Sequence, residues 1–300
     1  MNEELVSVII PTYKRSEMLP RAVESALNQT YSNIEVVVVD DNDPESTWRK
    51  DTSERMLQFK NDNRVKYICH EKNSNGSVAR NTGIKNAAGS IIAFLDDDDT
   101  YFSTKIEKQV DYLIMHPEYQ AVYTGWIRGN QTIIPTHEGD LSFDILSGNN
   151  IIYTNVIMMW KRCSEKFGGW DESFRRNQEA AFLLRFFDAG YKIGVVSEAL
   201  VLFDVSDRSN AAVNSIVNAE QMMQLLNTYS DSVKRCEEYK KGSKKKIICS
   251  RKKGIILSYI KDKKYAEAKN ATGEMLKKYP VFFCWTMFKY VLKRIAGKNY

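Results

Sequence analysis

Two groups of aspartate side chains are the residues of this chain best suited to chemistry. Asp40 and Asp41 follow the apolar run Ile34–Val39. Asp96–Asp99 follow the apolar run Ser90–Leu95. Four successive carboxylates repel one another, so keeping them together costs free energy unless a cation lies nearby. Mg²⁺ and Mn²⁺ take oxygen ligands and usually share them with the phosphates of a substrate. The pattern therefore favours a divalent-cation site for a phosphorylated ligand over a solvated acidic turn.

The elements that must position these aspartates alternate between strands and helices. β-branched apolar runs predict strands at Val6–Ile10, Ile34–Val39, Val65–Cys69, Ser90–Leu95 and Ala121–Gly125. Apolar spacings of three and four predict helices at Leu19–Leu27 with Ser16 as N-cap, at Ser77–Ala88 with Ser77 as N-cap, and at Thr104–Met115. This alternation predicts an α/β fold with a mostly parallel sheet between helices. Ligands bind such sheets at the carboxyl ends of the strands, where both aspartate groups lie.

The second half of the chain is less regular and then becomes helical and basic. Its predicted elements are a helix around Phe182–Phe187, a strand at Ile193–Val196, and helices beyond about Asn214. Residues 234–300 contain 20 Lys or Arg and 5 Asp or Glu, a net charge of +15, whereas residues 1–233 carry a net charge of −10. This asymmetry predicts two parts, residues 1–215 and a helical basic extension at 216–300. The extension, with aromatic residues among its lysines, either binds an anionic membrane surface or packs as an ordinary solvated helical part.

Several protein classes are excluded by what the sequence lacks. The five cysteines form no C-x-x-C pair and there are only three histidines, so neither a disulfide framework nor a zinc site is expected. We find no secretory leader and no apolar run of the roughly 18 residues that span a membrane. No G-x-G-x-x-G follows a strand, which argues against a dinucleotide-binding oxidoreductase, and no nucleic-acid partner is expected. These features predict a cytoplasmic protein, with peripheral attachment to the inner face of the cell membrane as the alternative offered by the basic extension.

Four motifs, in order and at fitting spacing, resemble the family 2 glycosyltransferases. They are Ser7-Val8-Ile9-Ile10-Pro11-Thr12-Tyr13, Val37-Val38-Val39-Asp40-Asp41-Asn42, Ala79-Arg80-Asn81-Thr82-Gly83-Ile84 and Phe94-Leu95-Asp96-Asp97-Asp98-Asp99. The resemblance covers about residues 5–205 and implies the GT-A fold, with a Rossmann-like sheet flanked by helices. It also implies an inverting, metal-dependent enzyme of bacterial polysaccharide or glycolipid synthesis. Such an enzyme moves a hexosyl or N-acetylhexosaminyl group from a nucleotide-diphosphate sugar, expected to be a UDP-sugar, to a hydroxyl of a saccharide or lipid-linked saccharide.

The resemblance implies roles for single residues on the donor side. The residues that it places around the nucleotide are Pro11, Thr12, Tyr13, Asp40, Asp41, Arg80, Asp96 and Asp97. Asp41, or Asp40 beside it, matches the carboxylate that accepts a hydrogen bond from the base. Asp96 and Asp98 match the outer positions of the family's D-x-D, with Asp96 towards the ribose and Asp98, together with Asp96, on Mn²⁺ or Mg²⁺. Asp97 stays an alternative because four aspartates in a row leave the register open by one.

The acceptor side is implied by the segments Gly168–Phe174 and Arg176–Glu179. Glu179 occupies the position of the family's catalytic base, where Asp is frequent, so its longer side chain departs from the pattern. A carboxylate there takes the proton of the acceptor hydroxyl as its oxygen attacks the anomeric carbon. Trp170 either stacks on a sugar face or is a buried aromatic residue. Asp171 is a further acceptor-side candidate.

The chain departs from the family near its last predicted strand, and two rival functions stay open. Many members carry a late His or basic residue near the diphosphate, for which Arg208 would substitute here. A nucleotidyltransferase would have a Gly-rich phosphate loop after the first strand, where this chain has Pro-Thr-Tyr-Lys-Arg. A catalytically silent scaffold of a polysaccharide assembly complex would not need the intact aspartate cluster and Glu179.

Overall fold

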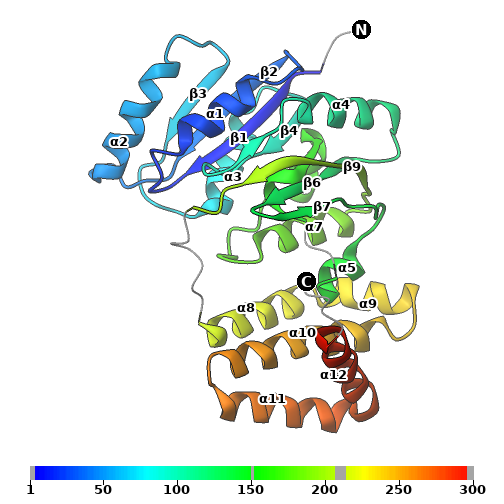
Figure 1. Ribbon diagram of the computed structural model, residues 1–300. Helices are drawn as coiled ribbons and strands as arrows, with labels where there is room; N and C mark the ends of the chain where they lie inside the picture. The colour runs from blue at the N-terminus through cyan, green and yellow to red at the C-terminus, as the bar shows by residue number, and fades with distance from the viewer. Residues whose placement is uncertain (1–3, 150–151, 207–213, 296–300) are drawn as a thin grey trace. The chain divides into compact units, whose positions relative to one another are not determined.

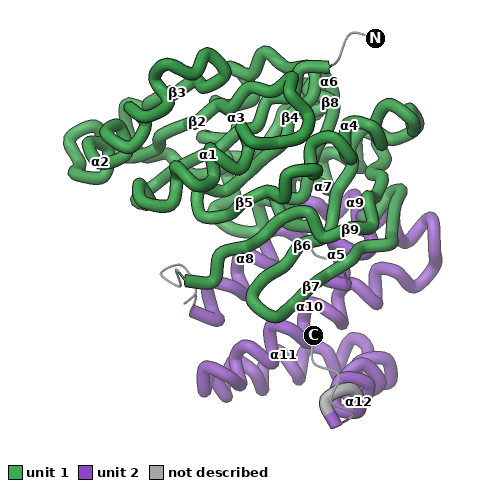
Figure 2. Tube along the Cα trace, turned by 45° about the horizontal axis from the view of Figure 1, so that its top comes forward, with its two compact units in different colours: residues 1–141, 152–208 green, residues 142–151, 209–300 purple. Residues whose placement is uncertain are grey.

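The computed structural model describes residues 4–149, 152–206 and 214–295. The chain forms two compact units, which Figure 2 distinguishes by colour. The first unit comprises Met1–Leu141 and Ile152–Arg208, and the second comprises Ser142–Ile151 and Ser209–Tyr300. Segment 142–151 therefore belongs to the second unit although it lies within the predicted 1–215 domain. The predicted boundary at 215/216 falls seven residues after the point where the chain leaves the first unit for the last time.

The first unit is built on a mixed sheet of nine strands (Figure 1). The strands are β1 Val6–Thr12, β2 Ile34–Asp40, β3 Val65–Cys69, β4 Ile91–Phe94, β5 Thr100–Tyr101, β6 Ala121–Arg128, β7 Gln131–Ile133, β8 Ile157–Trp160 and β9 Ile193–Phe203. Their order is β3-β2-β1-β4-β8-β6-β9-β5, with β7 paired to β6. Strands β1 to β4 are parallel, as predicted, whereas β8 runs antiparallel to both β4 and β6. The parallel half carries both aspartate groups at its carboxyl edge.

Helices flank this sheet (Figure 1). They are α1 Leu19–Leu27, α2 Thr47–Met56, α3 Gly76–Asn86, α4 Lys105–Met115, α6 Lys161–Phe167 and α7 Gln178–Asp188, with 3₁₀ turns at Leu57–Phe59 and Thr154–Val156. Helix α3 lies so close to β1 that a Cβ added at Gly83 would come within 2.3 Å of Ile9 Cγ2. Only glycine allows this approach, which fixes the helix that carries Arg80 against the sheet.

Two predicted helix caps are wrong. Helix α1 begins at Leu19 after Met18, without a side-chain cap, because Pro20 suits the first turn, where no amide hydrogen is needed. Ser16 lies outside this helix. Helix α3 is capped by Asn75, whose side-chain oxygen accepts from the Val78 amide at 3.1 Å, so Ser77 lies inside the helix.

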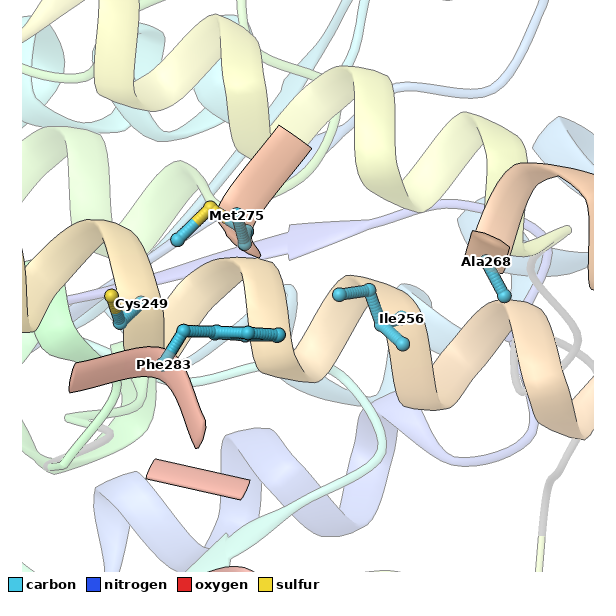
Figure 3. Close-up of a cluster of buried hydrophobic side chains, with 5 residues drawn as sticks. All are labelled: Cys249, Ile256, Ala268, Met275 and Phe283. Carbon is cyan, nitrogen blue, oxygen red and sulfur yellow. The ribbon is translucent and has the colours of Figure 1, made fainter. Parts of the chain in front are cut away.

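The second unit is helical. It contains α5 Ser142–Ser147, α8 Ser215–Thr228, α9 Ser230–Tyr239, α10 Ser243–Lys261, α11 Tyr265–Lys278 and α12 Pro280–Ile295. Its core joins α10, α11 and α12 through the buried side chains of Cys249, Ile256, Ala268, Met275 and Phe283 (Figure 3). Within the described part of the chain, none of the helices combines the length and the apolar character that crossing a bilayer requires.

Candidate active site

The loops after β1 and β4 are joined by Asp97. Thr12 Oγ1 donates a hydrogen bond to Asp97 Oδ2 at 2.7 Å, and the Tyr13 amide donates to the same oxygen at 3.3 Å. Arg15 Nη1 lies 3.2 Å from the other oxygen. Asp97 is only 3% exposed. Because both of its oxygens are engaged by the protein, this carboxylate holds the loops together, and Asp96 and Asp98 are the better placed to face a ligand.

Asp96 and Asp98 are the more accessible members of the cluster, and each is paired with an arginine. Their side chains are 33% and 19% exposed. Arg80 Nη2 lies 2.6 Å from Asp96 Oδ1, and Arg15 Nη1 lies 2.9 Å from Asp98 Oδ2. These ion pairs offset part of the repulsion within the cluster.

The fourth aspartate, Asp99, serves the fold. Its side chain accepts hydrogen bonds from the Asn155 side chain and from the Asp204 amide, the latter at 2.8 Å. Asn155 Oδ1 in turn accepts from the Asp96 amide at 2.9 Å. A single buried asparagine thus connects the turn before β8 to both ends of the aspartate cluster.

Negative charge is crowded in this cluster. Burial raises the pKa of Asp97 to about 7. Burial, with the charges of Asp96 and Asp98, raises the pKa of Asp99 to about 8. Burial and the charge of Asp96 also raise the pKa of Asp98. A divalent cation would relieve this crowding, and carboxylate oxygens are suitable ligands for it.

A cation here would need ligands from a bound substrate as well. Among the residues that the structure describes, no three His, Cys, Asp or Glu side chains converge as a complete metal site. Mg²⁺ characteristically binds through one or two carboxylates and completes its shell with substrate phosphates and water. The exposed oxygens of Asp96 and Asp98 fit that mode.

Asp40 and Asp41, at the end of β2, have different surroundings. Asp40 is fully buried, and it accepts hydrogen bonds from Tyr67 and from Asn42, while Arg49 Nε lies 3.1 Å away. Asp40 therefore holds β2, β3 and α2 together.

Asp41 is held by a loop rather than by the sheet. His70 Nδ1 lies 2.7 Å from its Oδ1, the Ser74 amide donates to that oxygen at 2.9 Å, and Asn73 Nδ2 donates to Oδ2 at 2.9 Å. Burial raises the pKa of Asp41, against the effect of these bonds. Of the two predicted base-contacting carboxylates, Asp40 has a side chain with no exposed surface, whereas the Asp41 side chain is 4% exposed and has both oxygens engaged by the loop, so Asp41 stays the candidate by a small margin of accessibility.

Arg80 links residues that the sequence predicts for the donor side to residues that it predicts for the acceptor side. Its guanidinium bonds to Asp96 at one end, and its Nη1 donates to Gln178 Oε1 at 3.0 Å at the other. The guanidinium carbon also lies 4.9 Å from the centroid of the Trp170 ring. The arginine thus stands between the D-x-D segment and the first residue of α7.

Glu179 lies in the first turn of α7, one residue after Gln178. The helix begins after Asn177, which has a left-handed backbone (φ 56°) that Asn tolerates better than most residues. Thr154 Oγ1 donates to Glu179 Oε1 at 3.2 Å and orients the carboxylate. The neighbouring Gln178 reaches Arg80 and through it Asp96, so the chain brings the predicted base and the D-x-D segment to one region.

Trp170 does not face a ligand, and the sugar-stacking alternative for it is wrong. The residue is 1% exposed. Its ring stacks on Phe182 with centroids 4.2 Å apart and meets the edge of Phe94 at 5.2 Å. Both faces of the indole are therefore covered by protein, with Arg80 on one side, and Trp170 serves as a core residue that supports the site.

The other predicted residues have varied surroundings. Asp171 accepts from the Ser173 amide at 3.0 Å and lies 4.0 Å from Arg185, so it stabilises a turn on the acceptor side. Tyr13 is 39% exposed at the end of β1, where its ring is accessible. Pro11 pairs with Val39 within the sheet. Arg208 lies outside the described residues.

Four residues of this region were not singled out from the sequence. Arg15 pairs with Asp97 and Asp98, Asn155 orders both ends of the cluster, and His70 holds Asp41. Asp204 accepts from Arg21 Nη2 at 2.9 Å, and the same nitrogen donates to the Asp98 carbonyl at 2.7 Å. Of these four residues, Arg15 is the one that could have been predicted from the sequence, because it lies four residues after Pro11 of the first motif.

The fold and this arrangement agree with the family to which the chain belongs. The sequence profile of Glycosyl transferase family 2 matches residues 7–174, more than half of the chain, so the chain is a member of that family. An uncharacterized glycosyltransferase of Rickettsia conorii is 31% identical over 268 residues, which are 78% of this chain and 43% of that protein. A UDP-Glc:alpha-D-GlcNAc-diphosphoundecaprenol beta-1,3-glucosyltransferase of Escherichia coli is 34% identical over 135 residues, which are 43% of this chain and 51% of that protein. The chain thus spans about half the length of the curated relatives it matches.

Solved structures show the same fold. The crystal structure of an S. aureus TarS fragment in complex with UDP-GlcNAc matches with a TM-score of 0.61 at 19% identity, covering 76% of this chain and 66% of that one. At this level of identity the likeness shows the fold alone. It confirms the predicted GT-A fold.

Proposed function

We propose that this chain transfers a sugar from a UDP-sugar to a hydroxyl of a lipid-linked saccharide, with inversion at the anomeric carbon. The observation that carries the proposal is the position of Arg80, which bonds to Asp96 of the D-x-D segment and to Gln178 beside Glu179. The guanidinium of Arg80 thus lies between the D-x-D segment, which we propose binds the diphosphate, and the segment that carries the candidate base Glu179. Direct displacement needs such an arrangement, with the leaving group held on one side and the base on the other.

On the donor side, Asp96 and Asp98 would hold Mn²⁺ or Mg²⁺ together with the diphosphate of the donor. A bound cation would neutralise the charge that develops on the departing diphosphate. Asp41 would accept a hydrogen bond from the base, and the exposed ring of Tyr13 lies at the same edge of the sheet. Arg80, which is bonded to Asp96, would contribute positive charge beside the phosphates of the donor.

On the acceptor side, Glu179 would take the proton of the attacking hydroxyl. A single carboxylate base is sufficient for direct displacement, which requires no covalent intermediate. Thr154 holds one oxygen of this carboxylate and leaves the other for the acceptor. The α-linked sugar of the donor would then give a β-linked product.

The substrate class rests on the relatives. The E. coli relative uses UDP-Glc and a diphosphoundecaprenol-linked GlcNAc, as its name states. A UDP-sugar donor and a lipid-linked acceptor are therefore the substrates that we propose first. Since such an acceptor resides in a membrane, the reaction would take place at a membrane surface.

The test is nucleotide release from a panel of nucleotide sugars, with Mn²⁺ or Mg²⁺ and a lipid-linked saccharide. We expect turnover with a UDP-sugar, its loss in EDTA, and its recovery when the cation is restored. Asp98→Ala should mimic chelation, whereas Asp51→Ala, at an exposed position of α2, should leave turnover unchanged. If the protein bound a nucleotide sugar but never turned it over, it would instead be a catalytically silent binding subunit. If turnover were unchanged in EDTA, the proposed role of the divalent cation would be wrong.

A further inference from the structure

Helix α12 has two apolar faces, and among the described residues one of them is buried in the core of the second unit whereas the other is exposed. The inner face places Phe283, 2% exposed, in the core formed with α10 and α11 (Figure 3). Phe282 and Met287 pack partly against the same core. Because these side chains pack against the core, the orientation of α12 about its own axis is fixed, and the side chains on its opposite face point outward.

The outer face is a continuous apolar stripe. Its residues are Val281, Trp285, Phe288, Leu292 and Ile295, between 47% and 83% exposed. Their spacings of four, three, four and three residues place all of them along one side of the helix. Cys284 and Val291 widen the stripe. Exposed large apolar side chains gathered in this way mark an interaction surface rather than ordinary solvated surface.

The middle of the stripe is formed by two aromatic rings. Trp285 and Phe288 stack with centroids 5.7 Å apart, and they line a shallow apolar depression together with Pro280, Val281 and Cys284. Lys289 Nζ lies 5.1 Å from the centroid of the Trp285 ring, at the edge of the stripe. Tryptophan beside lysine is typical of helices that lie in a membrane interface, with rings among the acyl chains and ammonium groups among the headgroups.

The net charge of the sequence segment that contains α12 favours one kind of partner. Residues 277–298 contain six Lys or Arg, and no Asp or Glu follows Glu274 in the sequence. Two copies of the chain meeting through this face would bring two such segments together, and like-charge juxtaposition is costly. An anionic lipid surface instead attracts each basic residue held near it.

We propose that the outer face of α12 docks in the plane of an anionic lipid bilayer. The apolar stripe would enter the boundary between headgroups and acyl chains, and the basic residues would bind the headgroups. This surface is formed by residues of the second unit, whereas the candidate active site is formed by residues of the first unit. Binding therefore needs neither donor nor acceptor, and it can be measured independently of the transfer reaction that we propose.

The experiment is co-sedimentation of the full chain with vesicles of phosphatidylcholine alone or mixed with phosphatidylglycerol. The test variant is Trp285→Glu with Phe288→Glu, at two exposed positions. The matched control is Leu57→Glu with Met115→Glu, at two apolar positions of the first unit that are 61% and 68% exposed. The control makes the same change in charge and leaves α12 intact. Unchanged melting temperatures verify that both variants fold.

We expect binding to the mixed vesicles that weakens as salt is raised, a loss of about tenfold or more in the α12 variant, and little change in the control. A blue shift of the fluorescence on binding should diminish in Trp285→Phe. Equal vesicle binding by the α12 variant would overturn the proposal, because the lysines alone would then suffice. Failure of the wild-type chain to bind vesicles would also overturn the proposal. If the chain were then found to be a dimer that the α12 variant dissociates, the outer face of α12 would be an interface between two copies instead.

Discussion

At the scale of single residues, Glu179 is the side chain whose chemical role can best be separated from binding. Glu179→Gln keeps the size of the side chain and its contact with Thr154 but removes the ability to take a proton at neutral pH. We expect donor affinity to stay within a few-fold and transfer to fall by roughly 10²–10⁴, the usual contribution of a positioned base. Donor binding by calorimetry and transfer rates under saturating substrate measure the two effects.

Glu54→Gln, at an exposed position of α2 where the side chain keeps 60% of its surface, is the matched control and should leave both quantities unchanged. If Glu179→Gln transfers sugar at the parental rate, the base lies elsewhere. Glu172, whose Oε1 accepts from Asn81 Nδ2 at 2.8 Å, is then the next carboxylate to replace.

The sequence indicated several of the residues that gather at the candidate site but not which of them are accessible. Asp97 and Asp98 are adjacent and chemically identical, yet one is sealed by Thr12 and the other is partly exposed. That difference depends on where the loop after β1 lies. Trp170 was equally ambiguous, because its burial depends on its packing against Phe94, which is distant in sequence, and against Phe182 of α7. Accessibility is a property of tertiary packing and has no local signal.

At the scale of elements, the parallel half of the sheet is fastened by Glu35 of β2. Its Oε1 accepts hydrogen bonds from Ser7 Oγ in β1 and from the Ala88 amide before β4, and Lys66 Nζ in β3 lies 2.7 Å from Oε2. Burial acts to raise the pKa of Glu35, but these bonds, above all that of Lys66, outweigh it and leave the pKa below its ordinary value. One carboxylate thus connects β1, β2, β3 and the turn that precedes β4.

This shift predicts a pH dependence of stability. Because the folded-state pKa of Glu35 is lowered, its stabilising effect is complete above the unfolded-state pKa of about 4.3 and is lost as the pH falls through the folded-state pKa. The difference in unfolding free energy between the wild type and Glu35→Gln should therefore be largest near pH 7 and shrink below about pH 4.3. Urea unfolding at several pH values measures it, with Glu54→Gln as the exposed control. A difference that grows as the pH falls would contradict the assignment.

Most element positions in the parallel half followed from apolar periodicity, whereas β8 and α5 did not. β2 lies within one residue of its predicted bounds because a buried parallel strand is a continuous apolar run with polar ends. β3, a half-buried strand at the edge of the sheet, has the bounds that were predicted for it. The apolar run that contains β8 is interrupted by Tyr153, Thr154 and Asn155 and gave no clear period, so its insertion between β4 and β6 could not be predicted. Short elements such as α5 carry too few residues for a periodic signal.

At the scale of the whole molecule, the charge asymmetry of the sequence indicated two parts, but it could not reveal that segment 142–151 belongs with the later one. Helix α5 is held in the second unit by α10. Arg251 Nε donates to the Leu146 carbonyl at 2.7 Å, its Nη2 donates to the Ile145 carbonyl, and Ser250 Oγ donates to the Ser147 carbonyl at 2.7 Å. These bonds satisfy carbonyls at the end of a helix that has too few turns to be stable alone.

A chain shortened to residues 1–208 would therefore lose the partners of α5. Ile145 and Leu146, 4% and 0% exposed in the full chain, would become accessible, and each buried side chain of this kind contributes about 1.5–3 kcal/mol. We expect the fragment to bind the dye ANS and to aggregate at concentrations at which the full chain does not. Ile145→Ser with Leu146→Ser should reduce both effects in the fragment while destabilising the full chain. The same substitutions would thus improve the behaviour of the fragment and lower the stability of the full chain. Opposite effects of this kind distinguish exposure of α5 from a general loss of stability. A fragment as soluble as the full chain, and no more able to bind ANS, would show that α5 does not depend on the second unit.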